Sequence, residues 1–105
     1  MREKDLIAGI KSGDQNAFRF LVDQYQSMVL NTCFNFVHDE DDAKDLTQDA
    51  FVEVYDSIHK FRRDSKLSTW LYRVAVNKSL NFIKKNKRKR QVDNMKYFFR
   101  DRKSV

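Results

Sequence analysis

The chain has 105 residues, a net charge of +6, two glycines and no proline, so long helices meet few residues that would break them. A hydrophobic fraction of 41%, with nine Phe, excludes a disordered chain and suits one domain with a modest core. Cys33 stands alone, which excludes an intrachain disulfide and favours a buried thiol. No apolar run reaches the ~18 residues of a membrane span, so we expect a cytoplasmic protein without membrane insertion.

Charge is unevenly distributed along the chain. Residues 38–56 hold eight acidic side chains against one lysine, whereas the chain from Lys60 onward holds sixteen Lys or Arg against three Asp. The acidic segment suits a basic protein partner, and the basic segment suits nucleic acid. The alternative, that both are solvated faces of one helical bundle, has more weight for the acidic segment than for the basic one.

Two helices are expected before residue 38. The first covers Glu3–Ser12, with Gly13 suited to its C-terminal cap, and Asp14 is suited to cap a second helix over Gln15–Val37. Apolar residues recur every three or four positions in both, which is typical of helices that bury one face in a core. They are Leu6, Ile7 and Ile10 in the first helix, and Ala17, Phe18, Leu21, Val22, Tyr25, Met28, Val29, Cys33, Phe36 and Val37 in the second.

An acidic segment, His38–Asp42, then interrupts the apolar pattern. Asp39 or Asp41 is suited to cap a third helix, and carboxylates in a first helical turn interact favourably with the helix dipole. A metal site is the alternative for acids beside a histidine. Consecutive acidic side chains point in different directions and no second His stands at ligand spacing, so we expect no metal here.

The third helix, predicted over Asp42–Lys60, has two different faces. The face predicted to be buried carries Ala43, Leu46, Thr47, Ala50, Phe51, Val54 and Ile58. The opposite face carries Asp45, Gln48, Asp49, Val52, Tyr55 and Asp56. Apolar side chains among charges on an outward face favour a protein contact patch, and a merely solvated face is an equal alternative.

A basic loop, Phe61–Lys66, follows with the sequence FRRDSK. Loops on rigid scaffolds often carry function, and Phe61 or an arginine plane could stack on an unpaired base. The alternative is that Phe61 is buried as a plug at the end of a helix.

The stretch Leu67–Arg90 is predicted to be a helix that enters the core and ends in a basic run. Ser68 or Thr69 is suited to be its N-cap. Between Lys84 and Arg90 only Asn86 is uncharged, which favours contact with a phosphate backbone over a simple solvated tail. The buried side is predicted to hold Leu71, Val74, Ala75, Phe82 and, more loosely, Lys78.

After Arg90 the pattern changes. The apolar residues there lack a long partner pattern; they are Met95, Tyr97, Phe98 and Phe99. We therefore predict one helical domain over residues 1–90 and a tail or the start of a linker over 91–105, helical for a turn or two.

Three stretches resemble region 2 of bacterial sigma factors of the extracytoplasmic-function (ECF) group of the sigma-70 family. They are GDQNAFRFLVDQYQSMV, DDAKDLTQDAFVEVYDSIHKFR and DSKLSTWLYRVAVNKSLNFIKKNKRK. The corresponding family patterns are GDxxAF, DAxDLxQxxF and TWLxRIAxN, in the same order, and the third reads TWLYRVAVN here, so the resemblance covers about residues 10–90. Trp70-Leu71 stands where housekeeping sigma factors carry two adjacent aromatics, which fits the ECF group. Nothing after Arg90 resembles region 4, so we expect this chain alone not to direct full promoter recognition.

The resemblance implies an all-α fold, a compact three-helix core with a short N-terminal helix and no sheet. It implies that the module binds the β′ clamp of RNA polymerase core and recognises and helps melt the promoter minus-ten element on its non-template strand. An anti-sigma factor is a further expected partner, no cofactor is expected, and the free chain is expected to be a monomer. By position, the polymerase-binding residues are Asp45, Gln48, Asp49, Val52 and Tyr55. The DNA-binding residues are Phe61, Arg62, Arg63, Ser65, Lys66, Trp70, Arg73, Asn77, Lys78, Asn81, Lys84, Lys85 and Arg88.

Two other classes of function fit the sequence less well. A basic helical domain that binds nucleic acid without sequence preference explains Lys84–Arg90 but not the separate patch from Asp45 to Tyr55. An enzyme is not expected, because His38 and His59 have no partnered nucleophile in the sequence and no glycine-rich phosphate loop is present.

Overall fold

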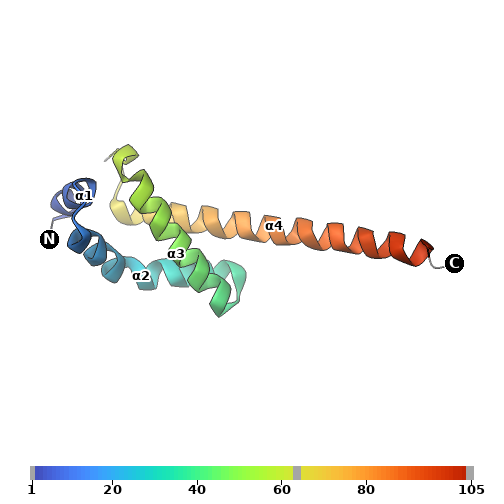
Figure 1. Cartoon of the computed structure of the whole chain (residues 1–105). Coiled ribbons are helices and arrows are strands. Elements are labelled where there is room, and N and C mark those ends of the chain that lie inside the picture. Colours follow the sequence, from blue (N-terminus) through green and yellow to red (C-terminus); the bar gives the residue numbers. More distant parts are fainter. Residues whose placement is uncertain (1, 63–64, 104–105) are drawn as a thin grey trace.

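A computed structural model describes residues 2–62 and 65–103 of the chain, with side chains up to Arg100. The described residues form four α-helices and one short 3₁₀ helix, with no strand among them (Figure 1). The elements are α1 (Glu3–Lys11), α2 (Gln15–Val37), α3 (Glu40–Ser57), η1 (Ile58–Lys60) and α4 (Leu67–Lys103). The predicted all-α class is confirmed.

The turn between α1 and α2 has the predicted glycine cap. Gly13 adopts a φ of +88°, which is left-handed backbone that glycine enters without steric cost. Its N–H donates to the Ile10 carbonyl at 3.0 Å, and the Asp14 N–H donates to the Gly9 carbonyl at 2.9 Å. These two bonds form a Schellman motif, and the Asp14 carboxylate then accepts from the Asn16 N–H at 2.9 Å. Both predicted caps are therefore confirmed.

A tight turn also joins α2 to α3. His38 closes α2 in the left-handed region with φ of 55°, and its N–H donates to the Phe34 carbonyl at 2.8 Å. The Asp39 carboxylate accepts from the Asp42 N–H at 2.9 Å, so Asp39 rather than Asp41 is the cap. Because the cap lies at Asp39, α3 starts at Glu40, two residues earlier than the predicted start.

The core lies where α2, α3 and α4 pack together, and α1 covers the end formed by α2 and η1. All seven residues assigned to the inner face of the third helix are buried, and so are Leu6, Ile7 and Ile10 of α1. Cys33 is fully buried, as expected for an inert thiol. The hydrophobic periodicity therefore identified the inner faces of α1 and α3 correctly.

The start of α4 differs from the prediction. Ser68 and Thr69 are not the N-cap, because the helix already begins at Leu67. The Leu67 N–H donates to Oε1 of Glu3 at 2.6 Å, so the side chain that satisfies this donor comes from α1. Leu67 and Ser79 join the predicted buried residues of α4, and the Ser79 hydroxyl donates to the Ala75 carbonyl at 2.8 Å.

The helix α4 continues well past the bundle. Figure 1 shows its second half (orange to red) projecting beyond the other helices, and the molecule measures 68 × 24 × 24 Å. A turn or two of helix was expected after Arg90, but α4 is continuous to Lys103, since no Gly or Pro interrupts it. The domain boundary at Arg90 stays a prediction. No helix within the described parts of the chain has the length and apolar character needed to cross a membrane.

Candidate functional site

The outward face of α3 carries the five residues predicted to contact a protein partner. All five are exposed, and the two apolar ones, Val52 and Tyr55, are exposed by 59% and 48%. The five are Asp45, Gln48, Asp49, Val52 and Tyr55. Because Val52 and Tyr55 are both more than two-fifths exposed, they can bury further apolar area in a complex.

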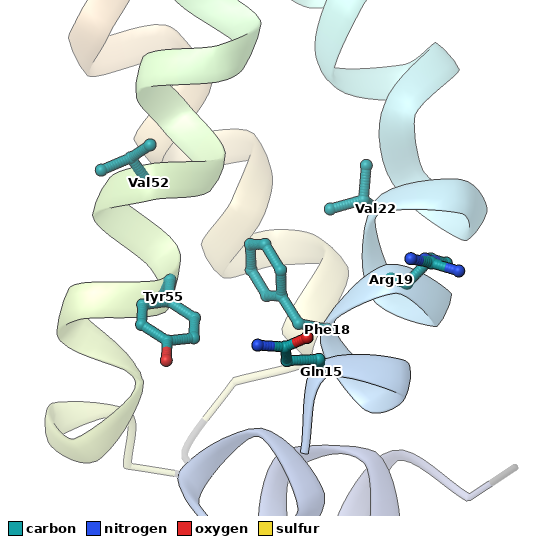
Figure 2. Close-up of a pocket in the computed structure, with 6 residues that line it drawn as sticks. All are labelled: Gln15, Phe18, Arg19, Val22, Val52 and Tyr55. Carbon is teal, nitrogen blue, oxygen red and sulfur yellow. The ribbon is translucent and has the colours of Figure 1, made fainter. Parts of the chain in front are cut away.

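Residues of α2 complete this face. A groove of about 580 Å³ lies between α2 and α3 and is lined by Gln15, Phe18, Arg19, Val22, Val52 and Tyr55. Figure 2 shows Phe18 of α2 and Tyr55 of α3 facing each other; their rings meet edge to face with centroids 5.1 Å apart. A second hollow of about 340 Å³ involves Gln48 and Val52 together with Phe18 and Val22.

The sequence had assigned Phe18 and Val22 to the core. Both are only half-buried, since each packs against the core with one side and lines the groove with the other. Their helical spacing matches that of fully buried neighbours such as Leu21, so periodicity cannot separate the two roles. The exposed, partly apolar face is therefore built from two helices rather than one; we call it the α2–α3 face, defined by Phe18, Val22, Gln48, Val52 and Tyr55.

Acidic groups gather at the start of α3. Desolvation raises the pKa of the Asp42 carboxyl above its ordinary value, and the neighbouring carboxylates of Asp39, Asp45 and Asp41 raise it further. In the part of the chain that the structure describes, no group of three His, Cys, Asp or Glu side chains is placed to hold a metal ion. The start of α3 is thus strongly electronegative.

A polar stripe runs along α4. Its members recur at intervals of three and four residues, which places them on one side of the helix. All are exposed except Trp70, which is half-buried. The stripe consists of Trp70, Arg73, Asn77, Asn81, Lys84 and Arg88, and Lys85 lies beside it. The structure therefore aligns six of the predicted DNA-binding residues on one side of α4, with a seventh, Lys85, beside them.

A second groove lies between this stripe and α3. It has a volume of about 880 Å³, and its α4 wall holds Lys78, Asn81, Lys84, Lys85 and Arg88, while Leu46 and Asp49 come from α3. The Lys78 ammonium pairs with the Glu53 carboxylate at 3.2 Å, with the two side chains 33% and 42% exposed. Lys78 is therefore engaged with α3, unlike the exposed lysines that follow it. Asp49 borders both this groove and the outer face of α3.

Phe61 does not present a free ring. It is only 7% exposed and stacks on Trp70, with ring centroids 4.8 Å apart and an angle of 21° between the planes. The idea that a base stacks directly on Phe61 does not fit this placement, because both the core and Trp70 cover the ring. The plug alternative fits, and it leaves Trp70 as the aromatic residue nearer the surface.

The other residues of the loop Phe61–Lys66 lie between Phe61 and Trp70 in the sequence. Arg62 and Lys66 are exposed and Ser65 is half-buried, whereas Arg63 lies outside the described residues. The backbone N–H of Trp70 donates to the Lys66 carbonyl at 3.1 Å, so Lys66 occupies the N-cap position of α4.

Comparison with known proteins identifies the family of this chain. Residues 21–89 match the family model for sigma-70 region 2. The chain is 39% identical over 82 residues to RNA polymerase sigma-H factor of Pseudomonas aeruginosa, covering 78% of this chain and 42% of that protein. It is 38% identical over 87 residues to the ECF RNA polymerase sigma factor SigW of Bacillus subtilis, covering 83% and 46%. The chain thus spans less than half the length of these relatives.

Solved structures show the same fold. An engineered region 2 of sigmaE, in complex with GTAAAA, superposes with a TM-score of 0.75 at 35% identity, covering 85% of this chain and 97% of that one. CnrH, in complex with the cytosolic domain of CnrY, superposes with a TM-score of 0.69 at 30% identity, covering 75% and 51%. From its matched motifs, its helical core and these relatives, the chain belongs to the sigma-70 region 2 family, in its ECF branch.

Proposed function

We propose that this chain is a transcription-initiation module that joins RNA polymerase core to the minus-ten element of a promoter. The observation that carries the proposal is that one rigid bundle presents two different surfaces, the α2–α3 face and the polar stripe of α4, with α3 between them. The stripe alone would suit any polyanion. The α2–α3 face has no role in a domain that only binds nucleic acid.

The α2–α3 face is proposed to bind the β′ clamp of the polymerase. Its apolar centre, Val52 with Tyr55 and Phe18, is flanked by exposed polar and acidic residues of α3. Protein interfaces commonly have this arrangement, with an apolar centre that carries most of the affinity and a polar rim that governs specificity. Asp45 and Asp49 would favour a basic partner surface.

The polar stripe is proposed to hold the non-template strand of the minus-ten element. A related region 2 has been solved in complex with GTAAAA, which supports a comparable site here. Taking a base out of the duplex costs a few kcal/mol, and stacking worth ~1–3 kcal/mol per base can offset it. Trp70 offers the ring, and Asn77 has both a donor and an acceptor for a base edge. Lys84, Lys85 and Arg88 would contact phosphates, which positions the strand without reading its sequence.

An inhibitory protein partner is also proposed. CnrH has been solved with the cytosolic domain of CnrY, so a region 2 relative is known to carry a bound protein. An anti-sigma factor that covers the α2–α3 face would block the polymerase, and we expect this competition to take place in the cytoplasm. The module would act by binding alone, without catalysis or a cofactor.

The first test measures binding to purified bacterial core RNA polymerase. The parent chain is compared with a triple variant, Asp45→Ala, Gln48→Ala and Asp49→Ala. A matched control removes the same side chains elsewhere, at the exposed positions Asp5, Asp23 and Gln24. We expect saturable binding by the parent and the control, and a loss of at least about tenfold in the α3 variant, since each lost interface contact commonly costs on the order of 1 kcal/mol.

A second test separates this function from nonspecific binding of nucleic acid. Asn77→Ala is compared with the parent on a single strand that carries GTAAAA and on a scrambled strand of the same composition. Sequence recognition predicts that the variant loses the preference between the strands. If the parent shows no preference and no binding to the polymerase, the nonspecific basic domain becomes the better description.

A further inference from the structure

The N-terminal helix reaches the start of α4 through one side chain. Oε1 of Glu3 accepts a hydrogen bond from the Leu67 N–H at 2.6 Å, across 64 residues of sequence. The first N–H groups of a helix have no partner within the helix, and a carboxylate satisfies one of them and interacts favourably with the helix dipole. The cap of α4 is therefore provided in part by another helix.

The Glu3 carboxylate is held in place by packing. Leu6, Ile7 and Ile10 bury one face of α1 in the core, next to η1 and α2. Burial raises the pKa of the Tyr25 hydroxyl on α2, and the negative charge of Glu3 raises it further. Glu3 thus lies at the end of the bundle where α1, α2 and α4 meet.

The first turn of α4 carries an aromatic residue of the polar stripe. Leu67 is fully buried and begins the helix, and Trp70, one turn later, stacks on Phe61. The backbone N–H of Trp70 also donates within this turn, to the Lys66 carbonyl at 3.1 Å. A change in how α4 starts would therefore move Trp70 before it moved any later member of the stripe.

We propose that Glu3 is a positioning residue for DNA recognition, which orders the first turn of α4 and thereby orients Trp70 without touching DNA. This inference rests on the proposed function of the polar stripe. Under this inference, α1 helps to determine the affinity of the module for a single DNA strand, although α1 lies outside the stripe and the α2–α3 face. Its effect should be confined to DNA, because the α2–α3 face is formed by other helices.

The test compares four proteins: the parent, Glu3→Ala, Glu3→Gln and Asp5→Ala. Asp5 is the matched control, since it is an exposed acid in the first turn of the same helix. Each protein is measured for affinity to a single strand carrying GTAAAA, affinity to core polymerase, thermal unfolding, and fluorescence of Trp70, the only tryptophan in the chain.

Glu3→Ala is expected to weaken binding to GTAAAA by about fivefold to tenfold, because a misoriented Trp70 loses part of its stacking on one base. Its Trp70 emission should shift, and its affinity for the polymerase should stay at the parent value. Glu3→Gln should recover most of the binding, because the amide oxygen still accepts from the Leu67 N–H. Asp5→Ala should behave like the parent in all four measurements.

Three results would overturn the inference. The first is an unchanged affinity of Glu3→Ala for GTAAAA, and the second is a failure of Glu3→Gln to recover binding. The third is a parallel loss of polymerase binding or of folding in Glu3→Ala, which would make Glu3 a residue of general stability. A parent chain that shows neither preference for GTAAAA nor binding to core polymerase would instead contradict the proposed function, and the Trp70 emission of the variants would still report on the cap.

Discussion

Two aromatic residues at the end of the bundle have different roles in the proposed base-binding site. Phe61 is buried and supports Trp70, whose ring lies nearer the surface. An aromatic residue that packs beneath another contributes apolar area and favourable ring geometry rather than a direct contact with a ligand. Phe61 therefore belongs to the structure of the site, and Trp70 belongs to its surface.

Replacement of Phe61 by Leu tests this division. A buried plug keeps most of its function when another apolar side chain of similar size fills the space, so the free energy of unfolding should fall by about 1 kcal/mol. The preference for GTAAAA over a scrambled strand should persist. Urea unfolding and strand binding measure the two effects. Full stability with a lost preference would show instead that a base stacks on Phe61.

Gly9 of α1 lies against Ala17 of α2. A Cβ atom added at Gly9 would lie 2.9 Å from the Cβ of Ala17, which is closer than two carbon atoms tolerate. Gly9→Ala should therefore destabilise the chain by about 1–3 kcal/mol, although alanine is the better helix former. Thermal unfolding measures the change.

The matched control is the double variant Gly9→Ala with Ala17→Gly, which restores the space between the helices. We expect it to be more stable than the sum of the two single changes, because residues in contact are coupled. Additive effects would mean that crowding at Ala17 does not cause the destabilisation by Gly9→Ala.

At the scale of the element, α3 is the shared wall of both proposed surfaces. Asp49 borders the groove toward α4 as well as the outer face, and Glu53 pairs with Lys78 of α4. The ion pair is partly exposed, so its contribution to stability is small, in the range of about 0.2–1 kcal/mol. Its more specific effect is to hold the Lys78 ammonium at Glu53 of α3 rather than along the proposed DNA-binding stripe.

The basic end of α4 predicts how the affinity for a single strand depends on salt concentration. The triple variant Lys84→Gln, Lys85→Gln and Arg88→Gln removes three proposed phosphate contacts. Affinity for a single strand should fall less steeply with salt, with the slope of log K against log salt concentration reduced by about 2, or roughly 0.7 per contact. The measurement is strand binding by fluorescence anisotropy across a range of salt concentrations.

The control carries Gln at Lys4, Lys11 and Lys44, which have the same summed charge but lie on α1 and α3. Its slope should stay close to that of the parent. Equal slopes for both triple variants would mean that net charge, rather than the end of α4, governs binding.

At the scale of the whole molecule, the bundle and the projecting part of α4 differ in burial. Phe82 is the last residue of α4 that packs against the core, and every described side chain from Lys84 to Arg100 is exposed. The projecting segment therefore adds little to the buried apolar area that stabilises the bundle.

A chain that stops after Arg90 tests the predicted domain boundary. Its free energy of unfolding should stay within about 0.5 kcal/mol of the full chain, as is usual when only exposed residues change. Its affinity for core polymerase should also be unchanged. A loss of more than about 1 kcal/mol would place the boundary further along the chain.

Much of this architecture could be predicted from local patterns. The caps at Gly13 and Asp14 depend on residues within one turn, so the sequence identifies them directly, and it limits the third cap to Asp39 or Asp41, of which the structure shows Asp39. The inner face of α3 follows from the 3.6-residue period, and all seven of its predicted residues are buried. The absence of Gly and Pro after Gly13 permits the long helix α4.

The remaining features depend on contacts between residues far apart in sequence. The sequence alone determined four helical segments, the inner faces of α1 and α3 and the family that the chain resembles, because propensity, capping and periodicity act over a few residues. Tertiary structure decided that Glu3 caps α4 at Leu67, that Phe61 lies beneath Trp70, and that Phe18 and Val22 open onto a groove. Local sequence patterns do not specify how helices pack against one another, and this packing determines which side of a half-buried residue faces solvent.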